Sequence, residues 1–198
     1  MPQAITRRHA LRFVGAATVT ALAGCLESGG EGGGPAEAGD ESTDPDGTGE
    51  LGDPAMDVDV AVVSIPNVAF EPGIVHVAPG GTVRWVVEGH RHDVTAYHPD
   101  TYGSQRIPDD VEPWESGLLR GGREFEVTFD EDGVYDYVDT RALCATHEAL
   151  GGVGRVVVGW PDSDGQPALE HDVTELPGRA ETLMRGYNEE TRAVLEER

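Results

Sequence analysis

Lysine is absent from this 198-residue sequence, and all fourteen of its basic residues are arginine. These arginines stand against 37 acidic residues, so the formal net charge is -23. A surface this acidic repels phosphate backbones, and the composition therefore excludes nucleic acid as a partner. Such an excess of acid is typical of the solvated coat of salt-loving proteins, so we predict a halophilic protein. An acidic docking face for a basic partner is the alternative interpretation.

Cysteine and long apolar runs are also scarce. The only cysteines are Cys25 and Cys144. The apolar stretch at 13–23 has about half the length of a membrane span, so it does not predict a transmembrane helix. If Cys25 is modified, as proposed below, Cys144 has no disulfide partner within the chain. Metal ligation or catalysis is the usual reason for such a thiol in an oxidising compartment.

The first 25 residues have the layout of an export signal. Residues Thr6–Arg12 resemble a twin-arginine signal, and the apolar stretch follows them. It ends in Leu22-Ala23-Gly24-Cys25, which resembles a lipobox, the motif whose cysteine is lipidated and becomes the new N-terminus. We therefore predict that residues 1–24 are a twin-arginine lipoprotein signal. A lipid on Cys25 would then hold the protein at the outer face of the cell membrane.

Composition divides the rest of the chain into three segments. Residues 25–56 are rich in Gly, Asp, Glu and Thr, and they have too few aliphatic side chains to offset the entropy cost of ordering. We predict that the lipidated cysteine is followed here by a flexible, disordered acidic linker, extended by charge repulsion. A patterned domain at 57–160 and a C-terminal extension at 161–198 follow.

The pattern at 57–160 is that of β-strands. Apolar side chains recur with period two in several stretches, and a run rich in β-branched residues closes the segment. Turn signals such as Pro79-Gly80-Gly81 and Glu131-Asp132-Gly133 separate these stretches. Short strands at this density predict an all-β fold, an antiparallel Greek-key β-sandwich. The predicted strands lie at 58–62, 74–77, 83–87, 92–97, 125–129, 134–138 and 153–158.

The C-terminal extension has a helical pattern. Apolar residues between Leu176 and Leu195 fall near a spacing of 3.6. We predict one or two short amphipathic helices, split near Gly186. Packing of this extension against the sandwich is the first interpretation, and docking of a partner protein is the alternative.

The segment with the most specific chemistry begins at Cys144. A thiolate at Cys144 and an imidazole at His147, three residues apart on a tight loop, can point at one centre. A second imidazole has to come from a distant strand. His92 is the candidate, because it shares with Val94 and Ala96 the face that should look into the sandwich. One thiolate and two imidazoles form the ligand set of a blue-copper electron-transfer site, and zinc is the competing metal.

Several motifs at about 65–159 resemble those of the cupredoxins, in particular the halocyanin, plastocyanin and pseudoazurin group. The most specific is the Cys-x-x-His-Glu block from Cys144, which leads through Gly151 into Val153-Gly154. The resemblance implies a cupredoxin-like domain in which His92, Cys144 and His147 bind a single mononuclear copper. It further implies a one-electron carrier rather than an enzyme, with membrane or extracytoplasmic redox proteins as its partners.

Two features depart from the family pattern. The position of the axial methionine is Gly152, and none of the three methionines lies nearby, so a backbone carbonyl, a water or an exogenous ligand would supply the fourth contact. The segment from Tyr135 to Cys144 is also about five residues longer than usual in this family. The excess either forms a bulge that leaves Cys144 in place or moves the thiolate out of the site. In the second case Asp139 lies near the usual end of the ligand strand.

These departures leave alternative functions open. A position without methionine at Gly152 suits a copper-scavenging or copper-delivery protein, or a small enzyme whose copper admits a substrate. A cupredoxin-like domain that has lost its metal and serves as a binding module is the remaining alternative.

The other histidines have less specific roles. His90 and His98 flank the His92 strand, and we expect both to be exposed, with metal contact as a minor alternative. His76 and His171 are expected on the surface.

Two carboxylates adjoin the expected ligands. Glu148 is interpreted as facing solvent or bracing the loop, with ligation as the minor alternative. Asp93 occupies the place where the family carries an asparagine that braces the ligand loop, so we expect this support to be altered.

Overall fold

The structure is a computed structural model, and it describes residues 47–64, 68–142 and 145–198. All of these residues fall within one compact unit of the chain. The predicted export signal, the lipobox with Cys25 and the predicted ligand Cys144 lie outside the described residues. Within the described part, no helix is long and apolar enough to cross a membrane.

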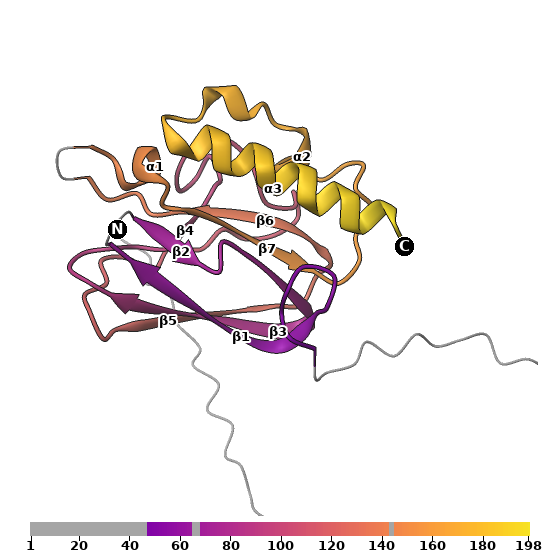
Figure 1. The fold of residues 1–198 in the computed structure, drawn as a ribbon, viewed down its shortest axis with the longest axis horizontal. Helices are drawn as coiled ribbons and strands as arrows, with labels where there is room; N and C mark the ends of the chain where they lie inside the picture. Colours follow the sequence, from indigo (N-terminus) through magenta and orange to yellow (C-terminus); the bar gives the residue numbers. More distant parts are fainter. Residues whose placement is uncertain (1–46, 65–67, 143–144) are drawn as a thin grey trace, which may run out of the picture. The chain divides into compact units, whose positions relative to one another are not determined.

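The strands of residues 55–158 form two packed layers (Figure 1). One layer contains β1, β2, β5 and the second half of β3, and the other contains β4, β6, β7 and the first half of β3. The bounds are β1 (Ala55–Val63), β2 (Ala69–Glu71), β3 (Ile74–Glu88), β4 (Thr95–Ala96), β5 (Glu124–Phe129), β6 (Gly133–Val138) and β7 (Val153–Val158).

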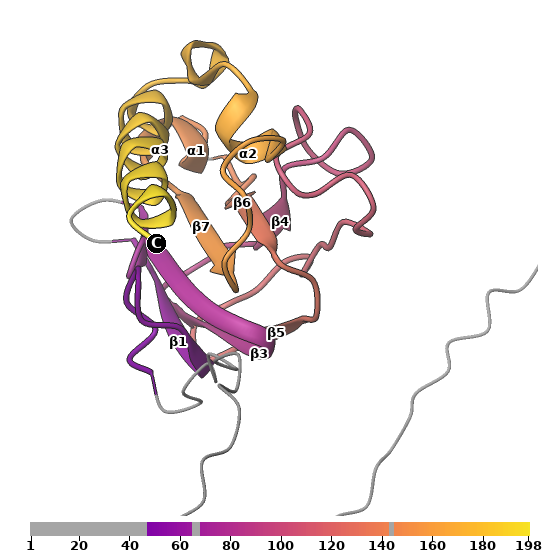
Figure 2. The ribbon, with the colours of Figure 1, turned by 90° about the vertical axis from the view of Figure 1, so that its right-hand side faces the viewer.

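Strand β3 belongs to both layers. Its residues 74–77 pair with β7, whereas residues 82–88 pair with β1 and mostly with β5 as well. The predicted turn Pro79-Gly80-Gly81 is therefore a bend inside one long, curved strand (Figure 2). Glycine is required at Gly81, because a Cβ there would lie 2.7 Å from the carbonyl oxygen of Ala78.

The sheet is mixed, so the prediction of an antiparallel sandwich is wrong in this respect. Strands β1 and β3 run parallel, as do β3 and β7, whereas the other pairs are antiparallel. The physical reason is β2, a three-residue strand that the sequence pattern did not predict. Strand β2 runs antiparallel to β1 along one edge of it. The chain then turns back, so β3 lies along the other edge of β1 and runs parallel to it.

The core lies between the two layers and follows the predicted alternation. Val83, Trp85 and Val87 are fully or almost fully buried, while the residues between them are partly exposed. Tyr137 of β6 meets Trp85 and Phe70 edge to face, with ring centroids 5.1 and 4.7 Å apart. Each such buried side chain contributes roughly 1.5–3 kcal/mol, so this core holds the layers in register.

The C-terminal extension covers the outer face of β6 and β7 (Figures 1 and 2). It comprises α2 (Pro167–Glu170), a 3₁₀ turn (Val173–Glu175) and α3 (Arg179–Glu196). Packing on the sandwich is thus the observed role, with Ala180 and Met184 of α3 fully buried. The chain is therefore mostly β with a long C-terminal helix, not purely all-β.

Helix α3 runs without a break through Gly186, so the predicted split is wrong. Glycine inside a helix costs about 1 kcal/mol relative to alanine. Met184, which precedes Gly186, is fully buried, and Asn188 and Thr191, which follow it, accept hydrogen bonds from Arg155. These contacts outweigh the cost of the glycine.

The described residues ahead of residue 57 include a loop at 47–54 that contacts His76. The imidazole of His76 is fully buried, so the expected surface position is wrong. Its Nδ1 accepts a hydrogen bond from the Gly52 N–H at 3.0 Å, and its Nε2 contacts the Gly159 carbonyl oxygen at 2.6 Å. His76 is therefore an internal support of the fold. His171 is exposed, as expected.

Candidate metal centre

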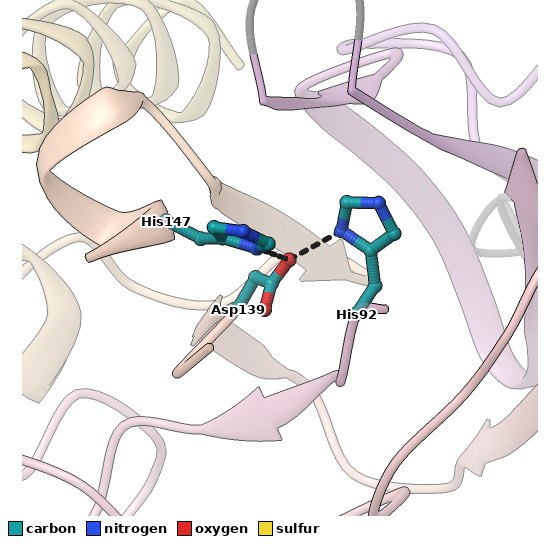
Figure 3. Close-up of side chains that lie close together, drawn as sticks. All are labelled: His92, Asp139 and His147. Carbon is teal, nitrogen blue, oxygen red and sulfur yellow. Dashed lines mark hydrogen bonds and ion pairs between the residues drawn. The ribbon is translucent and has the colours of Figure 1, made fainter. Parts of the chain in front are cut away.

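Three side chains from distant parts of the chain converge at one end of the sandwich: His92, Asp139 and His147 (Figure 3). They are buried, with exposed fractions of 1%, 0% and 6%. The Oδ2 atom of Asp139 lies 2.6 Å from Nδ1 of His92 and 2.7 Å from Nδ1 of His147. Both imidazoles thus turn the same nitrogen toward one carboxylate oxygen.

His92 is held by the segment opposite it and by Ser64. Two backbone hydrogen bonds pair His92 with Leu119, at 3.1 and 2.9 Å. The Ser64 hydroxyl lies 2.7 Å from Nε2 of the ring. With Nε2 engaged in this way, Nδ1 is the nitrogen that faces the centre. The sequence-based expectation that His92 points into the sandwich is confirmed.

His147 opens the short helix α1 (His147–Leu150). Its backbone N–H donates to the Arg141 carbonyl at 2.7 Å, and its own carbonyl accepts from the Gly152 N–H at 2.8 Å. The helix ends at Gly151, whose φ of 110° lies in the region that favours glycine. These contacts fix the histidine at a sharp turn just before β7.

Asp139 directly follows β6 and is held by the sheet. Its N–H donates to the Gly152 carbonyl at 2.9 Å, which continues the pairing of β6 with β7. Its second oxygen, Oδ1, accepts from the backbone N–H groups of Asp93 and Arg141 at 3.3 and 3.1 Å. The carboxylate is therefore fully buried and has hydrogen bonds on both oxygens.

Asp93 supports the chain that follows Asp139. It accepts hydrogen bonds from the Thr140 N–H at 2.7 Å and from the Thr140 hydroxyl at 2.6 Å. Burial raises the pKa of Asp93, while the hydrogen bonds from Thr140 oppose this rise. A carboxylate at this position thus braces the loop through Thr140.

Glu148 braces the loop from the other side and does not face solvent. Its two oxygens accept hydrogen bonds from the hydroxyls of Tyr97 and Tyr102, at 2.6 and 2.7 Å. Burial and the neighbouring carboxylate raise the pKa of Tyr102 to about 12. Of the interpretations that the sequence left open, loop bracing is the one observed.

The predicted metal residues are only partly brought together in the described chain. His92 and His147 meet, Cys144 lies outside the described residues, and its ligation stays a prediction. His90 is exposed, as expected, while His98 is partly buried and pairs with Asp100 at 3.8 Å. Neither belongs to the cluster of described donor atoms.

Gly152 is more tightly enclosed than an open axial position would be. A Cβ at this residue would lie 3.0 Å from Cγ1 of Val68 and 3.2 Å from Cβ of Asp139. A methionine there would have to displace one of these neighbours. Sequence reasoning singled out Gly152 for the missing ligand, whereas among the described residues the side-chain donor grouped with the two histidines is Asp139.

The donor set is suited to a copper ion. All three ligand atoms lie within 4.8 Å of one another and are buried. Imidazole nitrogen is a good copper ligand, and the carboxylate supplies a negative charge that a cation would offset. Zinc and iron(II) also accept two histidines and a carboxylate, so the donor set favours a divalent ion without selecting among these metals.

A cleft of about 880 Å³ opens beside His147. Ser64, Val68, Gly89 and Leu150 are among the residues that line it, and Leu150 is 42% exposed. His147 is one of the lining residues of this cleft, whereas Asp139 is not among them and is fully buried.

Comparison with known proteins identifies the same fold. Pseudoazurin from Methylobacterium extorquens AM1 superimposes with a TM-score of 0.53 at 20% identity, over 67% of this chain and 97% of the other. Pseudoazurin from Hyphomicrobium denitrificans gives a TM-score of 0.52 at 22% identity, over 67% and 96%. Residues 57–159 match the copper binding proteins of the plastocyanin/azurin family. This match spans just over half of the sequence and includes all three buried donors, so the chain belongs to the plastocyanin/azurin family of copper-binding proteins.

Proposed function

We propose that this protein binds one copper ion at His92 and His147 and serves as a one-electron carrier rather than an enzyme. The observation that carries the proposal is the convergence of two buried Nδ1 atoms on one point in a fold of the copper-binding family. Bound copper would supply the exchange between Cu(I) and Cu(II).

The residues around the centre favour electron transfer in two ways. The histidines are held by backbone hydrogen bonds to Leu119, Arg141 and Gly152, so the site is rigid and reorganises little when its charge changes. Burial of both rings excludes bulk water from the ligand atoms. The cleft beside His147 gives a redox partner access to one edge of the centre.

His92 is compatible with the apo and loaded states through a change of tautomer. In the metal-free tautomer with its proton on Nδ1, the ring would donate to Asp139, and Nε2 would accept from the Ser64 hydroxyl. If Nδ1 held a metal ion, the proton would reside on Nε2 and would be donated to the Ser64 oxygen. Ser64 therefore orients the ring in both states.

Copper loading combined with voltammetry tests the proposal. We expect one copper per chain, preferred over zinc and iron(II), and a reversible one-electron wave. His92→Ala and His147→Ala should each lose the copper, whereas His90→Ala should retain it because His90 is exposed beside the cleft. Tight copper binding without a reversible wave would instead indicate scavenging or delivery. No bound copper in the wild type would overturn the proposal.

We also propose that the carrier works at the outer face of the cell membrane with membrane or extracytoplasmic redox proteins as partners. The support is the sequence order of a twin-arginine-like segment, an apolar stretch and a lipobox-like cysteine. Replacement Cys25→Ser should move the exported protein from the membrane fraction to the soluble fraction. Retention of this variant in the membrane fraction would contradict the anchor.

A further inference from the structure

The position of Asp139 is set by the sheet rather than by the loop that follows it. Its N–H pairs with the Gly152 carbonyl, one step beyond the pairing of Val138 with Val153. In β6 the side chains alternate, so Asp139 shares the inward face of Tyr135 and Tyr137. The carboxylate therefore projects from the end of a rigid strand toward the space between the layers.

The two oxygens of the Asp139 carboxylate have different kinds of partner. Oδ2 receives both imidazole nitrogens, at 2.6 and 2.7 Å, whereas Oδ1 receives only backbone N–H groups. Oδ2 and the two Nδ1 atoms thus form a triangle of potential ligand atoms, and Oδ1 orients it (Figure 3). An oxygen held in this way is preorganised for the same cation as the two nitrogens.

The charge on Asp139 also favours a cation. The carboxylate is fully buried, and its partners among the described residues are two imidazoles and two backbone amides. The nearby Arg141 offers it only a backbone N–H, because the guanidinium of Arg141 lies by Asp93 at 3.9 Å. A buried carboxylate without a permanent positive partner is costly, and a bound metal ion would compensate it.

We propose that Asp139 is the third protein ligand, so that the copper of the proposed function is bound by two imidazole nitrogens and one carboxylate oxygen. The inference rests on copper binding at His92 and His147. It replaces the thiolate of the sequence-based prediction with an oxygen ligand located at the end of β6. Asp93 and Thr140 are positioning residues in this arrangement, since they hold the chain directly after Asp139.

A carboxylate ligand predicts a different spectrum from a thiolate. Sulfur bound to Cu(II) gives an intense visible charge-transfer band and a narrow copper hyperfine splitting, because the unpaired electron is shared with sulfur. Nitrogen and oxygen ligands give weak visible bands and a wide splitting. The full-length copper-loaded protein should therefore be weakly coloured, with the wide splitting.

The experiment compares absorption, EPR and Cu(II) affinity in four proteins: the wild type, Cys144→Ser, Asp139→Asn and the double variant Asp139→Cys/Cys144→Ser. We expect Cys144→Ser to match the wild type. Asp139→Asn should lower the affinity at least about tenfold. The double variant should gain the intense band, because its only thiol near the centre would project from position 139.

Asp109→Asn is the matched control, since Asp109 is an exposed aspartate. Circular dichroism of each apoprotein checks that it is folded. If Asp139→Asn fails to fold, the gain of a band in the double variant supports the inference independently.

The outcomes separate this inference from the proposed function. An intense wild-type band that disappears in Cys144→Ser overturns Asp139 as the ligand and leaves the copper carrier intact. Weak bands that depend on Asp139, in a protein without a reversible wave, support the inference and overturn the carrier. A wild type that binds no copper overturns both. A double variant that binds copper without gaining the band also counts against Asp139.

Discussion

Strand β6 contains one buried aspartate, Asp136, and a second, Asp139, directly follows it; the neighbours of each compensate its buried charge in a different way. Asp136 and Asp139 are both fully buried and lie three residues apart, so they face opposite sides of the strand. Asp136 points toward the C-terminal helices. There it is paired with Arg155 at 2.7 Å and, more loosely, with Arg106 at 3.5 Å. Asp139 points toward the layer interface, and its side-chain partners are two histidines.

The difference lies in whether the positive charge is permanent. A guanidinium is always charged, so the Asp136 cluster is complete as it folds, and Arg155 uses it to hold Asn188 and Thr191 of α3. An imidazole is neutral or charged according to its surroundings, and it also binds metals. The Asp136 cluster is thus a structural lock, whereas the Asp139 cluster can exchange protons for a metal ion.

Removing Arg155 from the Asp136 cluster should have the largest effect on the stability of the fold. In Arg155→Met the carboxylate of Asp136 loses its closest partner in a buried site, which costs about 3–5 kcal/mol. The measurement is urea-induced unfolding of the metal-free protein. The control is Arg84→Gln, which removes an exposed ion pair with Asp59 and should cost less than about 1 kcal/mol. Equal losses in the free energy of unfolding for the two variants would show that burial does not make the pair of Asp136 and Arg155 more important than an exposed pair.

Adding copper should stabilise the folded protein only through the Asp139 cluster. At a free Cu(II) concentration about 100 times Kd, the free energy of unfolding should rise by about 2.7 kcal/mol. His92→Ala should lose this increment, and Arg155→Met should keep it, because Arg155 lies on the opposite face of the sheet from the metal donors. Thermal unfolding with and without copper measures both. Loss of the increment in Arg155→Met would show that the two clusters are coupled.

The strands and the two histidines could be predicted from local pattern. Alternation marks Val83, Trp85 and Val87 as inward-facing because the period of a strand is two. His92 was identified by strand face and His147 by loop spacing. Both histidines lie together in the structure. They could be found because strand face and loop spacing depend on neighbouring residues alone.

The parallel pairing and the length of α3 could not be predicted in this way. The direction of β3 depends on β2, whose three residues are too few to show a period. The continuity of α3 through Gly186 depends on contacts with Arg155, which lies far away in the sequence. Tertiary contacts decided both features.

The position of Asp139 could be predicted from the sequence only in part. The lengthened segment before Cys144 placed it near the end of the ligand strand, but that length was compatible with a bulge or with a displaced thiol. Pairing of Asp139 with Gly152 is what places the carboxylate beside the histidines. A backbone register of this kind has no signature in residue type.

A smaller effect should separate backbone strain from metal binding. Gly151 has a φ of 110°, so Gly151→Ala should cost about 1–2 kcal/mol and also weaken copper binding by shifting His147. Gly165, with a φ of 79° and open space around it, is the matched control. Gly165→Ala should show a similar cost in urea unfolding with unchanged copper affinity. Equal copper affinity in both variants would contradict the role of the Gly151 turn in holding His147.

His76, a third histidine that is buried in the described part of the chain, sharpens the comparison, because its ring has hydrogen bonds to the backbone and none to a carboxylate of the described residues. The Gly52 N–H needs an unprotonated Nδ1, so the folded state favours the neutral ring, and burial lowers the pKa of His76 below its usual value. The unfolded chain, with a histidine pKa of about 6.5, therefore binds more protons than the folded chain just below that pH. The stabilisation that depends on a neutral His76 should be fully present above about pH 6.5. Below that pH the free energy of unfolding should fall by at most about 1.4 kcal/mol per pH unit. Urea unfolding of the metal-free protein across this range should show a shallower slope in His76→Gln than in the wild type, while His171→Gln, at an exposed site, should keep the wild-type slope. If His76→Gln keeps that slope as well, the pH dependence does not come from His76, and the contrast between a neutral structural histidine and two metal-binding ones is lost.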